Sequence, residues 1–536
     1  MSTSINRFVV LCASAALLCA ASVVQGQTYT VLHAISSGEG GTTNYPGLMA
    51  QGRDGNLYGT TTGGNSANAY GSIFKMTPDG SFQLIYTFSG KDGALPTSGL
   101  TLATDGNFYG TTESGGLNSF GTIFKITPAG TRTNLYDFTG STDGGYPFGP
   151  PVQGKNGTFY GTTLLGTSYS ITSLGTFKPL SNLPGPCYGP LLLASDGNLY
   201  GTSAQGGTTG NGTVFRLSAS GVVTLIYNFD GTHGSAPYGG LVQGSDGLLY
   251  GTTTSGGSIA NPGGVVFKVT LGGSITVLHQ FDSTSTTDGD EPVAGLVLAS
   301  DGNFYGSTSQ GANGPTVYGT LFKISRTGAY SVLHVFDQTN GATPSPTEMQ
   351  HTNGLIYGTA VNSSITNADG VIYSLNNSLK ANVAPVTQFG APGQSVQILG
   401  TGLIGATGVS FGTGSATFKV VSDTFMTAVV PTNGTTGVIT VTRPSGTLIS
   451  NKKFMVTPLI SSFTPSSGPV GTQVTITGAG FLAATTLTFG GVKATSFIVN
   501  SATQITATVP TGAVTGKITV KTAGGTASSS TSFTVQ

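Results

Sequence analysis

The chain has 536 residues, of which 7% are charged, with 20 basic and 20 acidic side chains. Its length exceeds the roughly 300 residues at which single hydrophobic cores stop growing, so several domains are expected, and its 28 Phe and 20 Tyr exclude a disordered chain. Because no excess of positive charge is present, binding to a nucleic-acid backbone by counterion release is excluded as well.

The N-terminus has the pattern of a secretory signal peptide. Arg7 supplies a positive charge, an apolar run extends from Phe8 to Val24, and a Val-Gln-Gly cleavage pattern follows. We therefore predict a signal peptide over residues 1–26, a mature chain that begins near Gln27, and secretion to the cell surface or the extracellular space. An uncleaved membrane anchor is the alternative, and no membrane span is expected after cleavage.

A short signature of the type DGNLYGTT recurs along the next part of the chain. Two further alternating segments follow each copy, for example GTIFKITP from Gly121. Alternation with a period of two, together with Asp-Gly turns, predicts four short antiparallel strands per repeat, here termed a to d in chain order. Four strands in about 40–50 residues are typical of a propeller blade. The seven copies begin at Asp54, Asp105, Asn156, Asp196, Asp246, Asp301 and Asn353.

The seventh repeat has no segment of its own for strand d. A matching segment, Thr28–Ile35, precedes the first repeat and is similar to Tyr330–Phe336, the d strand of the sixth. We predict that this N-terminal strand completes the last blade, since closure of the ring removes a free sheet edge. The predicted domain is an all-β, seven-bladed propeller over residues 27–379.

The tandem DGNLYGTT units with trailing GTIFKITP segments resemble the choice-of-anchor tandem repeats of GloVer-containing proteins, which are exported bacterial proteins. The resemblance covers Thr28 to Asn377 and is carried by all seven copies of the motif. It implies a repeat fold and export, and it offers no catalytic residues to transfer.

After Lys380 the composition shifts towards Thr, Val, Ser and Gly, and two similar segments follow. PGQSVQILGTGLIGATGVSFG from Pro392 corresponds to VGTQVTITGAGFLAATTLTFG from Val470. Their alternating runs predict two immunoglobulin-like β-sandwiches, over 380–457 and 458–536. ISSFTPSSGPVGTQVTITGAGF from Ile460 resembles the IPT/TIG domain, and the first segment resembles a degenerate copy. This resemblance implies presentation or binding.

Few residues could carry catalysis. The chain has four Glu, no nucleophile elbow, no Walker-type loop and no metal-binding pair of His or Cys. Cys187, the one cysteine after the signal peptide, is expected to be a small packing residue, and no intramolecular disulfide is possible. His33, His279 and His334 occupy positions that hold Tyr in other d strands, so we expect them to pack as aromatic residues. The sequence predicts no enzyme.

The connections from strand d to the next strand a share a polar-Gly-x-x-Pro pattern. One interpretation is a repeated turn capped by its polar residue. The other is a ring of carboxylates around the channel mouth that binds Ca²⁺ or a polar ligand. The candidate ligand-binding residues are Asp92, Asp143, His233, Asp288, Asp290 and Glu291.

The leading functional hypothesis is an exported binding or adhesion protein, with the propeller as ligand platform and the immunoglobulin-like modules as spacer. Expected partners are an extracellular glycan or a surface protein, although the absence of Trp removes the best stacking residue for a glycan. Two alternatives remain open: a propeller-based polysaccharide-degrading enzyme and a purely structural envelope or matrix protein. No cofactor is expected apart from Ca²⁺.

Overall fold

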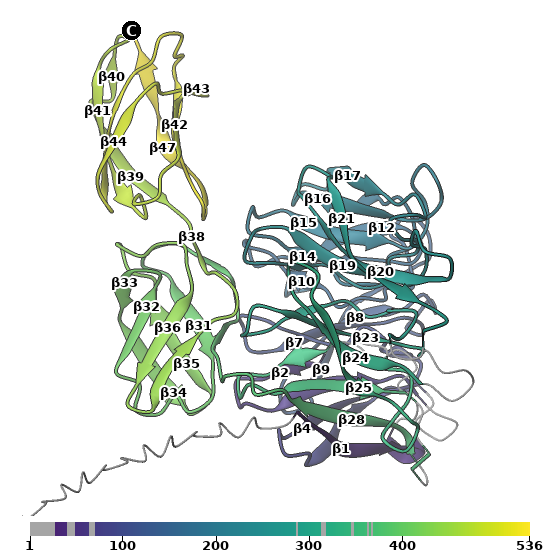
Figure 1. The fold of residues 1–536 in the computed structure, drawn as a ribbon. Coiled ribbons are helices and arrows are strands. Elements are labelled where there is room, and N and C mark those ends of the chain that lie inside the picture. Colours follow the sequence, from purple (N-terminus) through teal and green to yellow (C-terminus); the bar gives the residue numbers. More distant parts are fainter. Residues whose placement is uncertain are drawn as a thin grey trace, which may run out of the picture.

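The computed structural model describes residues 27–39, 49–63, 70–285, 288–311, 318–344, 348–361, 364–365 and 368–536. Within these ranges the chain consists of β-strands and one short 3-10 helix, η1 (Ser37–Glu39), which confirms the predicted all-β class. The strands form a large ring-shaped domain followed by two smaller sandwiches (Figure 1). The predicted signal peptide lies outside the described residues.

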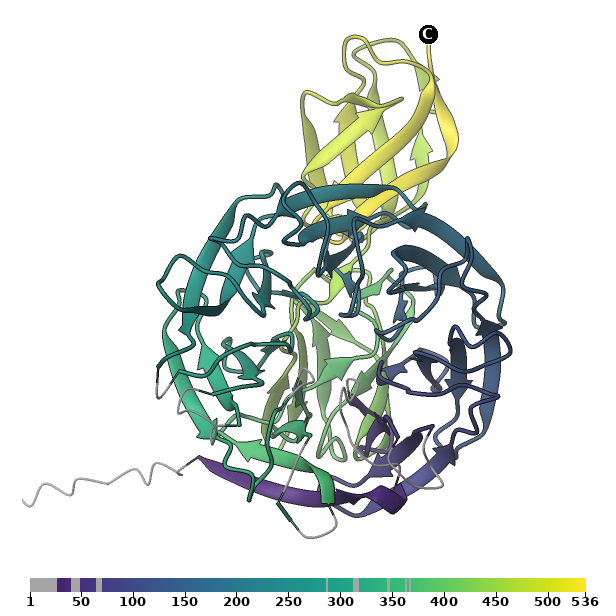
Figure 2. The same cartoon turned by 90° about the vertical axis from the view of Figure 1, so that its right-hand side faces the viewer.

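The large domain contains seven four-stranded antiparallel sheets among the described residues, arranged around a common axis (Figure 2). In each sheet strands a to d are hydrogen-bonded in sequential order, with the two-residue strand a innermost and strand d at the rim. This is the arrangement of propeller blades. The first three sheets are β2 (Ala50–Gln51), β3 (Leu57–Thr61), β4 (Ser72–Met76), β5 (Phe82–Thr87); β6 (Thr101–Leu102), β7 (Phe108–Thr112), β8 (Thr122–Ile126), β9 (Arg132–Asp137); and β10 (Val152–Gln153), β11 (Phe159–Thr162), β12 (Thr167–Ile171), β13 (Phe177–Asn182). The next three are β14 (Leu192–Leu193), β15 (Leu199–Ser203), β16 (Thr213–Leu217), β17 (Val223–Asn228); β18 (Val242–Gln243), β19 (Leu249–Thr253), β20 (Pro262–Val269), β21 (Ile275–Asp282); and β22 (Val297–Leu298), β23 (Phe304–Thr308), β24 (Thr320–Ile324), β25 (Tyr330–Val335).

The seventh sheet combines both ends of the repeat region. It consists of β26 (Met349–Gln350), β27 (Ile356–Ala360), β28 (Ala368–Asn376) and, at the rim, the N-terminal strand β1 (Thr28–Ser36). β1 runs antiparallel to β28, with Thr28 opposite Asn376. Tyr29 of β1 also stacks on His334 of the sixth sheet, with ring centroids 3.8 Å apart. The N-terminal segment thus occupies the position of strand d that the sequence predicted.

The repeated signature is explained by the buried tyrosine of strand b. The Tyr58 hydroxyl donates a hydrogen bond to Oδ2 of Asp54 in the preceding turn, at 2.9 Å, and Asn56 donates to the same carboxylate. Where the turn begins with Asn, the polarity is reversed: the Asn353 amide donates to the Tyr357 hydroxyl at 2.9 Å. The turn carboxylates are therefore structural, because they satisfy a tyrosine that is otherwise enclosed by the core.

The glycine of the Tyr-Gly-Thr sequence makes room for an aromatic residue of strand c. A Cβ atom at Gly59 would lie 2.4 Å from the ring of Phe74. In the seventh repeat the same slot holds Tyr373, whose hydroxyl would lie 2.2 Å from a Cβ at Gly358. Any larger residue in strand b would displace the ring that fills the blade.

The two C-terminal domains are β-sandwiches with matching strand order and separate hydrophobic cores. The last strand of the first sandwich, β38, ends at Val456, and the first strand of the second, β39, begins at Leu459. The first sandwich contains β29 (Ala384–Pro385), β31 (Ser395–Leu399), β35 (Phe425–Val429), β34 (Phe418–Ser422) in one sheet; β33 (Gly414–Ala416), β32 (Gly408–Phe411), β36 (Ile439–Arg443), β37 (Gly446–Ile449) in the other; and the parallel pair β30 (Phe389–Gly390) and β38 (Met455–Val456). The second contains β39 (Leu459–Thr464), β41 (Gln473–Ala479), β45 (Gln504–Thr508), β44 (Phe497–Ser501) in one sheet and β40 (Ser467–Gly468), β47 (Gly525–Val535), β46 (Gly516–Thr522), β42 (Thr486–Phe489), β43 (Val492–Lys493) in the other.

The first sandwich packs against the face of the ring that carries the tight a–b turns. Arg53, next to the first turn, donates from Nη2 to Oε1 of Gln397 at 2.6 Å and lies over the ring of Phe425. The Lys155 amine, next to the third turn, lies 3.8 Å from the ring centroid of Phe389. Both cations are held over aromatic rings, an arrangement that gains strength when water is excluded.

On the same face, this sandwich also contacts repeats that lie across the ring axis from the first and third. Asn451 donates to Oε1 of Gln350, in strand a of the seventh sheet, at 2.6 Å. The Lys453 amine donates to the Ser245 carbonyl, next to the fifth turn, at 3.2 Å. Contacts on both sides of the axis mean that the first sandwich covers the centre of the turn face, as Figure 2 shows from the other side of the ring.

One buried carboxyl distinguishes the seventh repeat. Glu348 is 2% exposed and occupies the slot before strand a that holds Leu in four other repeats. The Tyr373 hydroxyl donates to its Oε1 at 3.3 Å, whereas Oε2 has no hydrogen-bond partner. Burial raises the pKa of Glu348 to about 7, against the hydrogen bond from Tyr373 that favours the carboxylate.

Glu348 should make the stability of the fold depend on pH. Because the folded-state pKa is raised, the unfolded chain releases this proton first, so stability falls as the pH rises from about 4.5 to about 7, by roughly 3 kcal/mol. In the variant E348L/Y373F, which restores the Leu and Phe of other repeats, this loss should disappear. Denaturant unfolding at pH 5 and pH 8 measures it, and equal pH dependence in both proteins would contradict the prediction.

Candidate binding face

The ring has two faces with different connections. The tight a–b and c–d turns lie on the face that the first sandwich covers. The longer b–c and d–a connections lie on the opposite face, which is turned towards the viewer in Figure 2 and is called the open face below. All six candidate residues from the sequence lie on d–a connections of the open face.

In the first and second d–a connections the candidate aspartate caps its own turn. Asp92 accepts hydrogen bonds from the Tyr86 hydroxyl and from the Ser89 backbone and hydroxyl groups. Asp143 accepts from Tyr136 at 2.9 Å and from the backbone N–H of Thr139 at 2.8 Å. Partial burial opposes ionisation of both groups, but these hydrogen bonds outweigh it and lower the pKa of each carboxyl.

Asp288 also caps its own connection, and one of its partners is the side chain of His279. Its Oδ1 lies 2.8 Å from Nε2 of His279 in β21, and its Oδ2 accepts from the Asp282 backbone at 3.2 Å. His279 also stacks on Tyr330, with ring centroids 3.8 Å apart. The histidine therefore packs as an aromatic residue, as expected, and in addition binds the carboxylate of its own connection.

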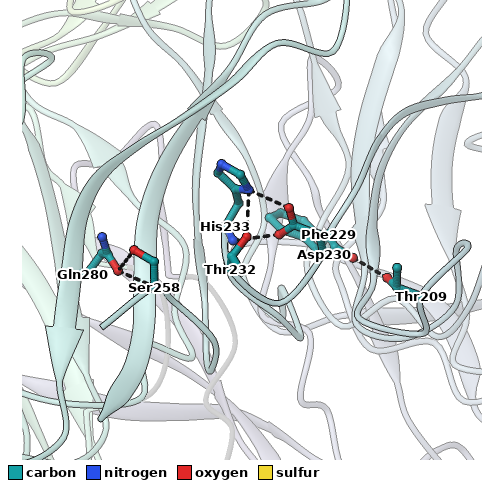
Figure 3. A network of polar contacts seen from close by, with 7 residues as sticks. All are labelled: Thr209, Phe229, Asp230, Thr232, His233, Ser258 and Gln280. Atoms are coloured by element: carbon teal, nitrogen blue, oxygen red, sulfur yellow. Dashed lines mark hydrogen bonds and ion pairs between the residues drawn. The ribbon is translucent and has the colours of Figure 1, made fainter. Parts of the chain in front are cut away.

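In the fourth d–a connection the histidine and the carboxylate exchange positions (Figure 3). His233 stands where other repeats have Asp, and the carboxylate comes from Asp230, three residues earlier. Asp230 accepts from the His233 backbone at 2.8 Å and lies 2.7 Å from Nδ1 of its ring. Although burial acts in the opposite direction, bonds from His233 and Thr232 lower the pKa of Asp230 to about 2. Asp230 was not predicted from the sequence, because it lies three residues before the position that the d–a connections share.

Asp290 and Glu291 differ from the capping residues. Asp290 pairs through its backbone with Gln310, and its Oδ1 accepts from the Glu291 N–H at 2.8 Å. The Glu291 carboxylate accepts from the Gln310 side chain at 2.8 Å. Burial raises the pKa of both carboxyls, and the charge of Asp290 raises that of Glu291 further.

The hydrogen bonds of Asp92, Asp143 and Asp288 match the capped-turn interpretation of the d–a pattern and not the ring of carboxylates around the channel mouth. Asp92, Asp143 and Asp288 bind residues of β5, β9 and β21, which are the outer strands of their sheets, so these carboxylates lie towards the rim. Their oxygens are already engaged by donors of the same connection. Within the described residues, no group of three or more His, Cys, Asp or Glu side chains could hold a metal ion.

The residue before proline in each of five d–a connections has a left-handed backbone. The φ angle is between 50° and 56° at these positions, which is rare for residues other than glycine. In each case the N–H donates to the preceding b–c connection and the carbonyl accepts from the following one, as for Tyr146, which bonds to Phe120 and Leu164. The open face therefore has a fixed backbone that presents different side chains: Leu95, Tyr146, Ala236, Glu291 and Thr343.

Cys187 lies beneath the open face in the short connection between the third and fourth sheets. It is 1% exposed and forms no disulfide, and burial raises the pKa of its thiol well above the ordinary value. A thiol in this state is a poor nucleophile. The expectation that it serves packing agrees with this burial.

The fold and the open face define a propeller-like repeat protein with C-terminal immunoglobulin-like domains. A sequence model of the Gloeobacter/Verrucomicrobia repeat matches residues 21–182 and 187–424, and the chain belongs to this family. The IPT/TIG model matches residues 458–535. Both predicted resemblances are thus confirmed. No curated protein matches the chain in sequence.

Several solved structures are similar to this chain over part of its length or most of it. The WD40 β-propeller domain of Doa1 is 12% identical, with 65% of this chain and 97% of that chain covered and a TM-score of 0.44. A fungal alcohol oxidase of the AA5 family is 11% identical, with 95% and 99% covered and a TM-score of 0.41. SGBP-B from a xyloglucan utilization locus of Bacteroides uniformis is 19% identical, with 28% and 48% covered and a TM-score of 0.16.

Removal of a capping carboxylate should weaken the fold without any involvement of metal. We expect Asp143→Ala to lower the free energy of unfolding by about 1–3 kcal/mol, because several donors lose their acceptor in a buried turn. A chelator should leave the melting temperature of the wild-type chain unchanged. A calcium-dependent rise in melting temperature that disappears in Asp143→Ala or Asp288→Ala would contradict this prediction.

Proposed function

We propose that this is an exported binding protein of the cell surface or extracellular space, and that it binds its ligand on the open face. The observation that carries the proposal is the position of the first sandwich, which covers the turn face and leaves the open face for a partner. The open face has the properties of a recognition surface: a backbone fixed by hydrogen bonds and side chains that differ from repeat to repeat.

Other features of the chain support an exported, non-enzymatic role. The signal-peptide pattern of residues 1–26 supports export, and no helix of the described residues is long and apolar enough to cross a membrane. Most of the titratable residues on the open face that were candidates from the sequence are engaged in turns. The second sandwich, an IPT/TIG domain, would then act as the spacer, whereas the first is part of the propeller assembly.

A binding array tests the proposal. The chain from Gln27 to Gln536 would be applied to extracellular glycans and to surface and matrix proteins, and at least one class should be retained. Leu117 and Leu165 are 82% and 50% exposed on b–c connections of the open face. Leu117→Arg combined with Leu165→Arg should weaken binding by about tenfold, as expected when a desolvated contact receives a charge.

A matched control lies on the second sandwich, where Ile498 is 67% exposed. Ile498→Arg should leave binding unchanged. Equal loss in both variants would place the binding surface elsewhere, and the absence of binding to every probe would favour a purely structural envelope or matrix protein.

A polysaccharide-degrading enzyme is the second candidate, because Asp290 and Glu291 are adjacent carboxyls whose pKa values are both raised. Carboxyls of this kind serve as general acids in glycoside hydrolysis. The variant D288N/D290N/E291Q separates the two functions. Loss of reducing-sugar release with retained binding would indicate an enzyme, whereas wild-type binding without turnover eliminates this candidate.

We also propose that the seven sheets form a complete seven-bladed propeller closed by β1. Support comes from the pairing of β1 with β28 and from the four strands present in every sheet. A chain that begins at Ser37 should melt at a lower temperature and associate through the exposed edge of β28. A synthetic peptide of residues 27–36 should restore the monomer, and an unchanged melting temperature would contradict closure.

A further inference from the structure

Three aromatic rings lie side by side on the open face, at the inner ends of three consecutive d–a connections. Phe148, Tyr188 and Tyr238 each lie four residues before the start of a strand a: β10, β14 or β18. The ring centroids are 5.2 Å apart for Phe148 and Tyr188 and 4.5 Å apart for Tyr188 and Tyr238. All three side chains are half-buried. They are called the aromatic arc below.

Glycines hold the backbones beneath the arc in close contact. A Cβ atom at Gly189 would lie 2.4 Å from the backbone nitrogen of Gly240, and one at Gly149 would lie 2.9 Å from that of Pro190. The Thr202 hydroxyl, from the neighbouring strand b, donates to the Gly239 carbonyl at 3.0 Å. The three rings are therefore carried by a rigid support, so little conformational entropy is lost when a ligand binds.

The fold itself does not require aromatic residues at these positions. The corresponding position, four residues before strand a, holds Thr97 in the first d–a connection and Val293 in the fifth. Both build the same backbone, with the same left-handed residue before the proline. Among the described residues, aromatic side chains at this position are therefore confined to three consecutive connections, as expected of a binding site and not of a packing rule common to all repeats.

The arc is uncharged over its whole length. Residues 144–151, 184–191 and 234–241, which carry the three rings, contain no Asp, Glu, Lys, Arg or His. In contrast, Asp288, Asp290 and Glu291 belong to a later connection of the same face. A ligand that stacks on the arc gains nothing from charge, which disfavours acidic polysaccharides and charged peptides and matches a neutral ligand.

We propose that the aromatic arc binds pyranose rings of a neutral polysaccharide by stacking. The axial C–H groups of a sugar present an apolar, slightly positive face that complements the negative face of an aromatic ring, and its equatorial hydroxyls remain in water. The two tyrosine hydroxyls add polar groups at the ring edges. This proposal rests on the proposed binding function and names its ligand class and the residues that carry it.

Affinity electrophoresis of the chain from residue 27 to 536 tests the arc. The gels would contain neutral polysaccharides (hydroxyethylcellulose, glucomannan or arabinoxylan) or the anionic alginate. The test variants are Tyr188→Thr and Tyr238→Val, which introduce the residues found in the same slot of other repeats and so preserve the fold. Each should weaken binding to a neutral polysaccharide about tenfold, the loss expected for one stacked ring.

Two control variants show whether the loss of binding comes from the loss of an aromatic ring of the arc. Tyr238→Phe keeps the ring and should bind within about twofold of the wild-type chain, since only the hydroxyl is removed. Tyr70→Ala removes another tyrosine of the open face, 45% exposed but outside the arc, and should also have no effect. Alginate should not retard the chain at any concentration that retards it with the neutral polymers.

The outcomes separate this proposal from the proposed function. Wild-type binding to a neutral polysaccharide that survives both Tyr188→Thr and Tyr238→Val would overturn the arc and leave the binding function intact. Retention on a protein array but on no neutral polysaccharide would do the same. Binding to no glycan and no protein would overturn both.

Discussion

The buried hydrogen bond between the strand-b tyrosine and the polar residue of the a–b turn is the interaction on which the large domain depends. Tyr58 and Asp54 form this bond in the first repeat, and an equivalent bond is present in every other repeat. It places the aromatic ring within the blade and fixes the turn that faces the first sandwich. Loss of the acceptor would leave a phenol unsatisfied in a region from which water is excluded.

This bond also determines which residues remain for recognition. The repeated Asp side chains are occupied by tyrosine on the turn face, and the capping Asp side chains by strand d on the open face. With 7% charged residues, the chain has few others to offer. Variation is therefore concentrated in the residues that flank the prolines of the d–a connections, where the backbone is held but the side chain is not constrained by the repeat.

The repeat region was predictable because its signals are local and periodic. Strand order, the turn role of Asp54 and the assignment of Thr28–Ile35 to the last sheet follow from alternation and motif comparison. The d–a pattern left a capped turn and a ring of carboxylates as alternatives, because it shows which residues recur but not the radial position of strand d. Asp230 was missed because it exchanges roles with His233 outside the motif, and nothing in either position alone indicates the exchange.

Contacts between domains could not be predicted for a different reason. Arg53, Lys155, Gln397 and Asn451 lie in unrelated motifs, and the contacts that they make form only when the ring and the first sandwich have both folded. The contact between Glu348 and Tyr373 could not be predicted either, because both residues differ from the Leu and Phe found at these positions in other repeats. Their contact places a hydrogen-bonded pair in the seventh repeat where four other repeats have Leu and Phe.

The docked first sandwich makes the two faces of the ring different in accessibility, because it covers one of them. A propeller without it would present two chemically different faces, one with tight turns stabilised by Tyr–Asp bonds and one with longer connections. The cation–aromatic contacts of Arg53 and Lys155 and the polar contacts across the axis cover the first of these. Only the second then combines exposure, a rigid backbone and side chains that differ between repeats, with aromatic rings on one side and carboxyls on another. The repeated residues therefore hold the backbone of the open face in place, and the side chains that differ between repeats determine what that face can bind.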